Sequence, residues 1–241
     1  MVKNDVTAVV LSGGVGSRLG SDIPKQYIRV AEKMVITYAL ETLIKHPYIE
    51  RLYIAASEQW RDNIIGDLDN YNINTHKLVG FSLPGNNRQA SIINSLNAIM
   101  NNGITSRMVL IHDAARPCIS EGLITRLIEA GNDCDGVMPV LQVKDTVYVS
   151  NDGYKVSGLL DRNKLYAGQA PELFDLKKYY KANASLSDTE LNRINGSTEP
   201  AFAAGMNIKI ISGDESNIKI TTKNDLERFK NSIIFKSNHE K

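Results

Sequence analysis

The sequence predicts an α/β protein in which a mostly parallel β-sheet carries helices on both faces. The first observation is a set of short, β-branched apolar runs that have the composition of buried strands: 6–11, 52–55, 108–111, 137–141 and 208–211. The second is that residues 35–44 and 92–100 repeat apolar residues with the period of a helix. Strands that alternate with helices are typical of a parallel sheet covered on both sides.

The length of the chain favours a single large domain. Its 241 residues, 42% of them hydrophobic, can cover one sizeable core. We therefore expect one domain over residues 1–241, with an arm inserted at about 143–167. Residues 182–200 are polar and rich in turn formers, which indicates a mobile connection and not a domain boundary.

The predicted arm interrupts the alternation of strand and helix. Residues 146–149 read Thr-Val-Tyr-Val, an Asn-Asp-Gly turn follows at 151–153, and residues 154–156 read Tyr-Lys-Val. Alternating residues on both sides of such a turn predict a β-hairpin. We expect it to project from the sheet as a dimerisation arm or as a lid.

Charge and cysteine content limit the possible partners. The 28 Lys and Arg residues balance 27 Asp and Glu residues to a net charge of +1, which argues against a nucleic-acid surface. Cys118 and Cys134 form no CxxC motif and lie beside no His pair, so neither a disulfide framework nor a zinc site is indicated. The apolar stretch near the N-terminus is too short for a signal sequence or a membrane span. We expect a soluble, cytoplasmic protein.

The first predicted strand ends in a glycine cluster, within LSGGVGSRLGSDIPKQY (11–27). Glycines between a strand and a helix let backbone N–H groups approach an anion closely. The dinucleotide pattern GxGxxG fails at Leu19, and the Walker A pattern fails because Ser21 and Asp22 follow Gly20. What remains is a glycine loop with Arg18 and Lys25, two cations that could fold over one triphosphate.

This stretch resembles the GGxGxRxG…PKQ signature of the CTP-dependent sugar- and polyol-phosphate cytidylyltransferases. That group contains the methylerythritol-phosphate and ribitol-phosphate enzymes. Further blocks that resemble the family's motifs follow in the family's order, at 84–96, 111–117, 143–147, 159–174 and 216–226. The resemblance covers nearly the whole chain and implies a Rossmann-like fold of the nucleotide-diphospho-sugar transferase type.

The resemblance also implies a CTP site. Arg18 and Lys25 match the residues that offset charge on the α-phosphate and on departing pyrophosphate. Asp113 follows the strand 108–111, and by resemblance it helps to hold the nucleotide and its Mg²⁺. The positions that match the family's CTP-binding residues are Leu11, Ser12, Gly13, Gly14, Gly16, Ser17, Gly85, Arg88, Ser91, Asp113 and Ala114. Among them, Gly85, Arg88 and Ser91 match the segment that reads cytosine.

A second set of positions matches the family's acceptor-binding residues: Asp145, Thr146, Arg162, Gln169 and Lys219. Arg162 and Lys219 match the cations that orient the acceptor's phosphate for attack. A phosphate monoester has its second pKa at about 6 and is mostly dianionic at neutral pH, so no general base is required. Because Arg162 belongs to the predicted arm, in a family-like homodimer it would serve the partner's site.

The sequence departs from the family on the acceptor side. A Thr-Asp-x-Ala element is replaced by Asn195-Gly196 in a gap-free alignment, and Thr198-Glu199 fits only with a shift. Ala170 and Glu172 stand where the family has Thr and Gln, although Gln169 is kept. His112 is interpreted as a satisfied, nearly buried histidine and not as a base. The CTP half of the pattern is therefore kept while the acceptor half has drifted.

These observations predict Mg²⁺-dependent transfer of CMP from CTP to an alditol phosphate, giving a CDP-alditol and pyrophosphate. The pairs Gly13-Gly14 and Gly168-Gln169 favour a ribitol-phosphate-type enzyme of capsule or teichoic acid biosynthesis. The three residues between Gly20 and Pro24 favour a methylerythritol-phosphate enzyme of isoprenoid biosynthesis, so the acceptor stays open. Transfer of UMP or dTMP, and a non-catalytic CTP-binding module, are the remaining alternatives.

Overall fold

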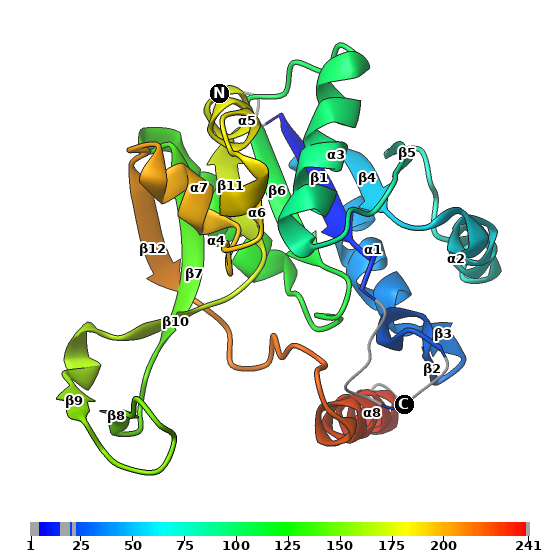
Figure 1. The fold of residues 1–241 in the computed structure, drawn as a ribbon. Helices are drawn as coiled ribbons and strands as arrows, with labels where there is room; N and C mark the ends of the chain where they lie inside the picture. Colours follow the sequence, from blue (N-terminus) through cyan, green and yellow to red (C-terminus); the bar gives the residue numbers. More distant parts are fainter. Residues whose placement is uncertain (1–4, 15–19, 21–22, 240–241) are drawn as a thin grey trace.

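The computed structural model describes residues 5–14, 20 and 23–239, and its centre is a mixed β-sheet (Figure 1). The strands run in the order β10-β7-β11-β6-β1-β4-β5, and β12 also pairs with β7. Their bounds are β1 Val6–Leu11, β4 Ile49–Ala55, β5 Leu78–Ser82, β6 Met108–Asp113, β7 Gly136–Gln142, β10 Tyr166–Gly168, β11 Glu172–Asp175 and β12 Ile208–Ser212. The predicted fold class is confirmed.

Most of the strand pairs are parallel, as predicted. Strand β1 pairs in parallel with β4 and with β6, and β12 pairs in parallel with β7. Strand β11 is antiparallel to both β6 and β7, and β10 is antiparallel to β7. All five predicted strands are present, whereas β5, β10 and β11 were not predicted. Two of these three are short antiparallel additions, and β5 is an edge strand with Gly80 at its centre.

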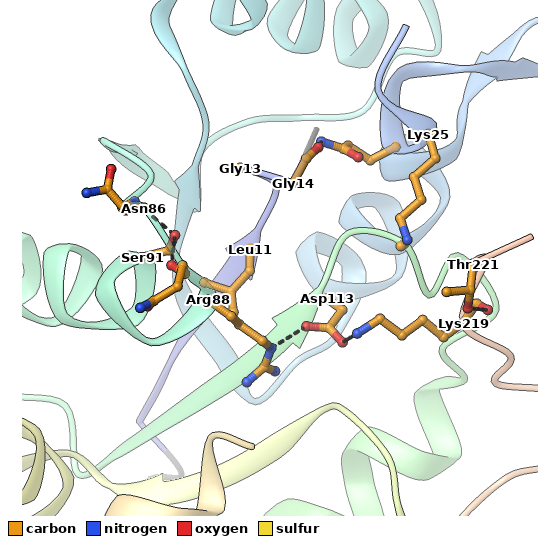
Figure 2. Close-up of a pocket in the computed structure, with 14 residues that line it drawn as sticks. Leu11, Gly13, Gly14, Lys25, Asn86, Arg88, Ser91, Asp113, Lys219 and Thr221 are labelled. Atoms are coloured by element: carbon orange, nitrogen blue, oxygen red, sulfur yellow. Dashed lines mark hydrogen bonds and ion pairs between the residues drawn. The ribbon is translucent and has the colours of Figure 1, made fainter. Parts of the chain in front are cut away.

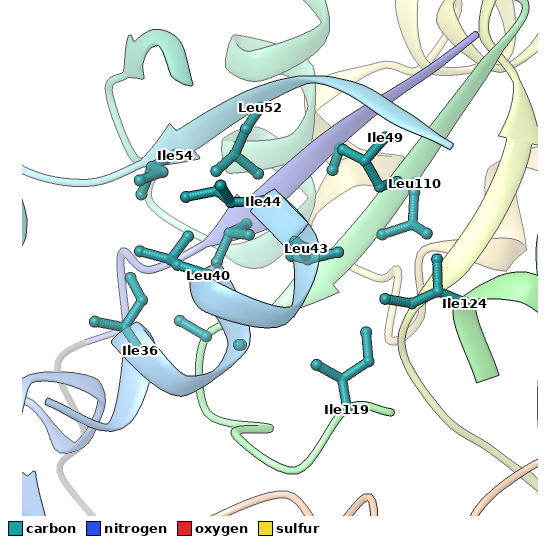
Figure 3. Close-up of a cluster of buried hydrophobic side chains, with 14 of the residues drawn as sticks. Ile36, Leu40, Leu43, Ile44, Ile49, Leu52, Ile54, Leu110, Ile119 and Ile124 are labelled. Atoms are coloured by element: carbon teal, nitrogen blue, oxygen red, sulfur yellow. The ribbon is translucent and has the colours of Figure 1, made fainter. Parts of the chain in front are cut away.

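Helices cover both faces of the sheet. Alternate residues of β1 point to opposite faces, so β1 contributes to a buried cluster on each side. Ala8 and Val10 pack with α1 (Val35–Lys45) and α4 (Glu121–Ala130) in one buried cluster (Figure 3). Val9 packs on the other side, in a second cluster with α3 (Arg88–Asn101) and α5 (Leu176–Ala184). The further helices are α2 Glu58–Asn70, α6 Asp188–Leu191, α7 Thr198–Ala203 and α8 Lys223–His239. No described helix is long and apolar enough to cross a membrane.

The arm is a separate two-stranded sheet that stands away from the body (Figure 1, lower left). Strand β8 (Val147–Val149) pairs antiparallel with β9 (Gly158–Leu160), as the hairpin prediction requires. The chain enters the arm after β7 and returns through β10, which lies beside β7. Tyr148 is 62% exposed and Leu159 is 64% exposed, so the arm presents apolar side chains to its surroundings.

Residues 182–200 are more structured than the sequence indicated. They contain all of α6 and the start of α7, where we expected only a connection. The hydroxyl of Tyr179 in α5 donates to the carbonyl of Ser197 at 2.8 Å, which ties the segment to the body. Both helices are only one or two turns long, so they could not be recognised from the sequence within this polar segment.

Candidate active site

A cavity of about 700 Å³ opens where β1 and β6 end, at the carboxyl edge of the parallel part of the sheet. Open α/β sheets bind ligands at this edge. The cavity is lined by Leu11, Gly13, Gly14, Lys25, Gln26, Gly85, Asn86, Asn87, Arg88, Ser91, Asp113, Ala115, Lys219 and Thr221. Figure 2 shows that these residues come from segments far apart in the sequence.

The structure brings together most of the residues predicted for CTP. Leu11, Gly13, Gly14, Gly85, Arg88, Ser91 and Asp113 line this cavity together with Lys25 and Lys219. Ser12 and Ala114 are buried behind the wall, and Ala115 lines the cavity in place of Ala114. Gly16, Ser17 and Arg18 lie outside the described residues, so their predicted roles stay predictions.

Two glycines of the cavity wall are required by close contacts. A Cβ atom on Gly13 would lie 2.3 Å from Cβ of Pro84, so the glycine loop and the segment at 84–87 could not touch. A Cβ atom on Gly85 would lie 2.3 Å from Cβ of Ala90 at the start of α3. A larger residue at Gly13 would therefore push the glycine loop away from the segment at 84–87, and a larger residue at Gly85 would push that segment away from α3.

The predicted cytosine-reading segment is held by the first turn of α3. Asn87 caps this helix, and its side-chain oxygen accepts from the backbone N–H of Ala90 at 2.8 Å. The Ser91 hydroxyl accepts from Gly85 N–H at 3.0 Å and donates to the Asn87 carbonyl at 3.0 Å. Ser91 thus fixes the shape of this segment, and the reading of the base by its hydroxyl stays a prediction.

Asp113 is the centre of a charged cluster (Figure 2). Its Oδ1 accepts from Arg88 Nε at 3.0 Å, and its Oδ2 lies 2.8 Å from Lys219 Nζ. Arg116 Nε is 3.9 Å from the same Oδ2. Burial alone would raise the pKa of Asp113, but the charges of Arg88 and Lys219 outweigh it and hold that pKa well below its usual range. The carboxylate is therefore ionised at any physiological pH.

Glu172 belongs to the same cluster, although we expected only that it changed the charge of the acceptor side. It is buried, and its Oε2 lies 3.6 Å from Arg88 Nη2. Its carboxylate accepts from the hydroxyls of Ser197 and Thr198. Burial raises the pKa of Glu172 despite the opposing charge of Arg88. Glu172 therefore links a residue of the main cavity to the start of α7.

A second cavity of about 240 Å³ lies on the other side of this cluster. Arg88, Asp113 and Lys219 line both cavities, so the two are neighbours. Its remaining wall is formed by Arg116, Met138, Gly168, Gln169, Ala170, Glu172, Asn195, Gly196, Ser197, Thr198 and Glu199. The residues that depart from the family pattern thus gather around one small cavity.

Gln169, which we predicted to bind the acceptor, uses its amide on the backbone. Its Nε2 donates to the Asp214 carbonyl at 3.0 Å, and its Oε1 accepts from the Asp214 N–H at 3.0 Å. These bonds tie β10 to the loop that leads to Lys219. Gln169 contributes to the wall of the second cavity, and direct contact of its amide with an acceptor stays a prediction.

The other predicted acceptor residues lie on the arm, away from both cavities. Asp145, Thr146 and Arg162 are exposed, and none of them lines the first or the second cavity. Arg162 Nη1 donates to the Lys144 carbonyl at 3.0 Å, in a separate hollow of about 370 Å³ at the root of the arm. The chain therefore does not bring Arg162 and Lys219 together at one cavity.

His112 is buried and lines neither the main cavity nor the second cavity. Its Nε2 lies 3.0 Å from the Arg116 carbonyl, and burial lowers its pKa to about 4. The ring is therefore neutral at physiological pH. Its Nδ1 is buried with no hydrogen-bond partner among the described residues, so the expectation of a satisfied histidine is wrong for one of the two ring nitrogens.

Asp113 can contribute to a magnesium site but cannot form one alone. No cluster of three His, Cys, Asp or Glu side chains suitable for a metal occurs in the described part of the chain. Mg²⁺ is commonly held by one or two carboxylates together with substrate phosphates and water. Asp113 is the one carboxylate among the described residues that line the main cavity, and it fits that arrangement only when a triphosphate supplies the other oxygens.

Sequence reasoning missed several residues of the main cavity. Gln26, Asn86, Asn87, Ala115 and Thr221 line it without having been assigned a role. All five lie within the motif blocks at 11–27, 84–96, 111–117 and 216–226, so their position in those blocks was the available signal.

The family model described as IspD, 2-C-methyl-D-erythritol 4-phosphate cytidylyltransferase, matches residues 6–234. The chain belongs to the IspD family. It is therefore a nucleotidyltransferase, specifically a cytidylyltransferase, and the family resemblance seen in the sequence is confirmed.

The relatives that the chain matches are named for different enzymes. The chain is 30% identical over 233 residues to the bifunctional enzyme IspD/IspF of Wolbachia pipientis wMel, which covers 95% of this chain and 55% of that relative. It thus spans about half the length of the bifunctional enzyme. It is 28% identical over 231 residues to ribitol-5-phosphate cytidylyltransferase of Lacticaseibacillus paracasei, covering 93% of this chain and 96% of that one.

A solved structure of the 4-diphosphocytidyl-2C-methyl-D-erythritol synthase from Anaerococcus prevotii matches with a TM-score of 0.77 at 25% identity. The match covers 95% of each chain. It supports an IspD-type fold over nearly the whole chain.

Proposed function

We propose that this IspD-family protein transfers CMP from CTP to an alditol phosphate of the ribitol 5-phosphate type. The observation that carries the proposal is the main cavity, where Lys25, Lys219 and the Asp113–Arg88 pair surround a space beside the glycine loop. Such a cavity can hold a triphosphate among cations and backbone N–H groups. The ribitol-phosphate relative, matched over 96% of its length, supports the acceptor.

The proposed reaction is an in-line displacement at phosphorus. An oxygen of the acceptor's phosphate forms a bond to the α-phosphorus, and the bond from that phosphorus to the bridging oxygen of the β-phosphate breaks. Pyrophosphate leaves with the electron pair. Lys25, together with Arg18, offsets the charge that develops on the α-phosphate and the leaving group. Lys219 orients the attacking phosphate.

Mg²⁺ is part of this proposal, with Asp113 as its protein ligand. When bound, the ion would neutralise triphosphate charge and orient its oxygens. Lys219 already lies 2.8 Å from one Asp113 oxygen, and Arg88 donates to the other. Asp113 therefore holds two cationic side chains in position whether or not an ion is bound.

We further propose a homodimer in which each arm completes the partner's site. Asp145, Thr146 and Arg162 lie on the arm, whereas Lys219 lies in the body at both cavities. The exposed apolar side chains of the arm, Tyr148 and Leu159 among them, support a protein partner for it.

Mixing two impaired variants tests the shared site, provided that turnover is measured with the acceptor well below its wild-type KM. Lys25→Ala removes a residue of the body, and Arg162→Ala removes one of the arm. After subunit exchange, half of the dimers carry one variant of each kind, and each mixed dimer has one intact site. The mixture should therefore recover about a quarter of wild-type turnover. No recovery, in a mixture shown to exchange subunits, would place Arg162 in its own chain's site, whereas an Arg162→Ala protein with wild-type turnover on its own would place Arg162 outside any site.

An acceptor panel tests the function itself. Pyrophosphate release from CTP should be measured with the phosphates of ribitol, mannitol, glycerol, erythritol and methylerythritol. We expect ribitol 5-phosphate to give the highest kcat/KM. Release with none of them would favour a non-catalytic CTP-binding module. Equal turnover of UTP would contradict the cytidylyl assignment.

A specific observation supports methylerythritol 4-phosphate as the second candidate acceptor. The bifunctional Wolbachia relative is 30% identical, slightly more than the ribitol-phosphate relative, and the Anaerococcus structure has the same fold. The spacing between Gly20 and Pro24 points the same way. Highest kcat/KM with methylerythritol 4-phosphate in the panel would establish this alternative.

We place the reaction in the cytoplasm, without a nucleic-acid or membrane partner. Cys118 and Cys134 form no disulfide in the described part of the chain, and the net charge of +1 argues against a polyanion-binding surface. Fractionation of cells that produce the protein would test the location.

A further inference from the structure

Two neighbouring side chains hold the start of the glycine loop by its carbonyl groups. Gln26 Nε2 donates to the carbonyl of Ser12 at 2.7 Å and to the carbonyl of Gly14 at 2.8 Å. The Tyr27 hydroxyl donates to the Ser12 carbonyl at 3.0 Å and accepts from the Ser12 hydroxyl at 2.8 Å. Gln26 is 3% exposed and Tyr27 is 4% exposed, so water offers these carbonyls little competition.

This arrangement fixes the direction of a backbone N–H group. A trans peptide unit is planar, so the carbonyl of Ser12 and the N–H of Gly13 point in opposite directions. Holding that carbonyl against Gln26 turns the Gly13 N–H away from Gln26. Glycine has the widest choice of backbone conformations, and a glycine pair therefore needs an external constraint to keep one of them.

The same short turn carries Lys25. Residues Lys25–Tyr27 form a single 3-10 turn, and Lys25, Gln26, Gly13 and Gly14 all line the main cavity. The Gln26 amide therefore joins the glycine loop to the turn that carries the proposed transition-state cation. Both must keep a fixed spacing if they are to contact the same triphosphate.

The turn also has a partner on its other side. The Tyr27 ring stacks on Trp60 of α2, with centroids 4.2 Å apart and an interplanar angle of 17°. Trp60 is the only tryptophan of the chain. Trp60 thus connects through the Tyr27 ring and hydroxyl to Ser12, at the start of the glycine loop.

We propose that Gln26 and Tyr27 are positioning residues that set the backbone of residues 12–14, at the start of the glycine loop, and its spacing from Lys25, for the triphosphate of CTP. The inference rests on the proposed function, because it takes CTP as the ligand of the main cavity. It adds that Trp60 fluorescence reports occupancy of the loop through Tyr27.

The decisive variant is Gln26→Glu, which keeps the size of the side chain but replaces the donor by an acceptor-only carboxylate facing two carbonyls. We expect its Kd for CTP with Mg²⁺, measured by calorimetry, to rise by about 10- to 100-fold, the effect of two lost and now repulsive contacts. The KM for the acceptor at saturating CTP should stay within about twofold, because no acceptor residue is touched. An unchanged Kd for CTP would overturn the proposal.

Tyr27→Phe is the milder, conservative variant. It keeps the ring on Trp60 and leaves both Gln26 bonds in place, so its Kd for CTP should rise by less than that of Gln26→Glu, about 3- to 10-fold. In the wild type, CTP should change the Trp60 emission. In Tyr27→Phe saturated with CTP, that change should be lost or strongly reduced. A full emission change in Tyr27→Phe would overturn the link from the loop to Trp60.

Controls separate positioning from general loss of stability. Thr37→Val removes the buried bond from Thr37 to Asp67, which involves no residue of the cavity. It should lower Tm without changing the Kd for CTP. If Gln26→Glu does not fold, Gln26→Met, which lacks both the donor and the charge, decides by the same Kd criterion. Wild type that binds no CTP would contradict the proposed function, whereas tight binding by both wild type and the Gln26 variants would contradict only the positioning role.

Discussion

Asp113 shows how a single residue can organise a site without being its reactive group. Its two carboxylate oxygens contact Arg88 and Lys219, which belong to α3 and to the loop before α8. Each contact joins ions in a poorly solvated place, where a lost partner leaves a charge uncompensated. Asp113 therefore positions one cation from α3 and one from the loop before α8.

At Lys25, the proposed role predicts a loss of rate larger than the loss of binding. Lys25→Ala should lower kcat by about 10² to 10³-fold, the usual effect of removing one group that stabilises transition-state charge. The Kd for CTP should change far less. Single-turnover pyrophosphate release and calorimetric titration with CTP provide the two measurements. An unchanged rate would refute the assignment of Lys25.

At Glu172, the raised pKa predicts a pH-dependent stability difference. Burial raises this pKa, so the folded protein retains a proton that the unfolded chain releases at about pH 4.3. The wild type therefore loses stability as pH rises from that value through the folded pKa. Glu172→Gln lacks this titration, so its free energy of unfolding relative to wild type should increase with pH and then level off.

Urea denaturation of both proteins across this pH range provides the measurement. Asp113 titrates in both proteins, so its contribution cancels in the difference. A difference that does not vary with pH would show that the pKa of Glu172 is not raised in the folded protein.

Among the elements, the arm has the most specific consequences. Arg162 and Lys164 belong to the same short turn between β9 and β10, and both are cationic. Only Arg162 matches the acceptor-orienting position. The pair therefore offers a matched comparison on one element.

Arg162→Ala should raise the KM for the acceptor by about 10- to 100-fold, from the loss of charged hydrogen bonds to phosphate. The KM for CTP should stay near that of wild type. Lys164→Ala is the control, because the Lys164 side chain is 84% exposed. Its ion pair, from Nζ to Asp161 Oδ2, is long at 4.0 Å and therefore weak. Steady-state kinetics with each substrate varied in turn would test this, and unaltered acceptor kinetics in Arg162→Ala would remove the arm from the site.

The elements also show what the sequence could and could not reveal. Long apolar runs predicted β1, β4, β6, β7 and β12, because strands buried on both faces need such residues. Strand β11 escaped prediction because it is four residues long, and its first residue is Glu172. An ionisable residue in a short segment favours a loop over a buried strand unless its partner is known. Here the partner is Arg88, which lies 84 positions away in the chain.

The site was predicted in the same uneven way. The family resemblance identified residues of the glycine loop, α3 and β6, and the structure places most of them around one cavity. The sequence could not reveal that Gln26 holds the loop carbonyls, that Ser91 bonds to its own segment, or that Gln169 is engaged by Asp214. These are contacts between segments, and only their geometry in three dimensions determines them.

For the whole molecule, the apolar arm predicts that assembly and acceptor use fail together. Leu159→Glu places a charge on an exposed apolar position of β9 and should convert the proposed dimer to a monomer in size-exclusion chromatography with light scattering. CTP binding should persist, because the main cavity lies in one chain. Turnover of the acceptor should be lost.

Val79→Glu is the matched control for this prediction. Val79 is 47% exposed on the edge strand β5, so the substitution adds the same charge at an apolar surface position outside the arm. It should leave the dimer and the turnover intact. A Leu159→Glu protein that stays dimeric would move the interface away from the arm.

The pairing of β10 with β7 has a consequence for how the acceptor preference of such enzymes can diverge. Tyr166 lies opposite Gln142, so the chain re-enters the sheet beside the point where it left. The intervening segment is a cassette with adjacent ends. Cassettes of this geometry can be lengthened, shortened or exchanged between relatives without shifting the register of any strand in the body. In the proposed shared site, the acceptor contacts made by the arm can thus change separately from the residues that line the main cavity.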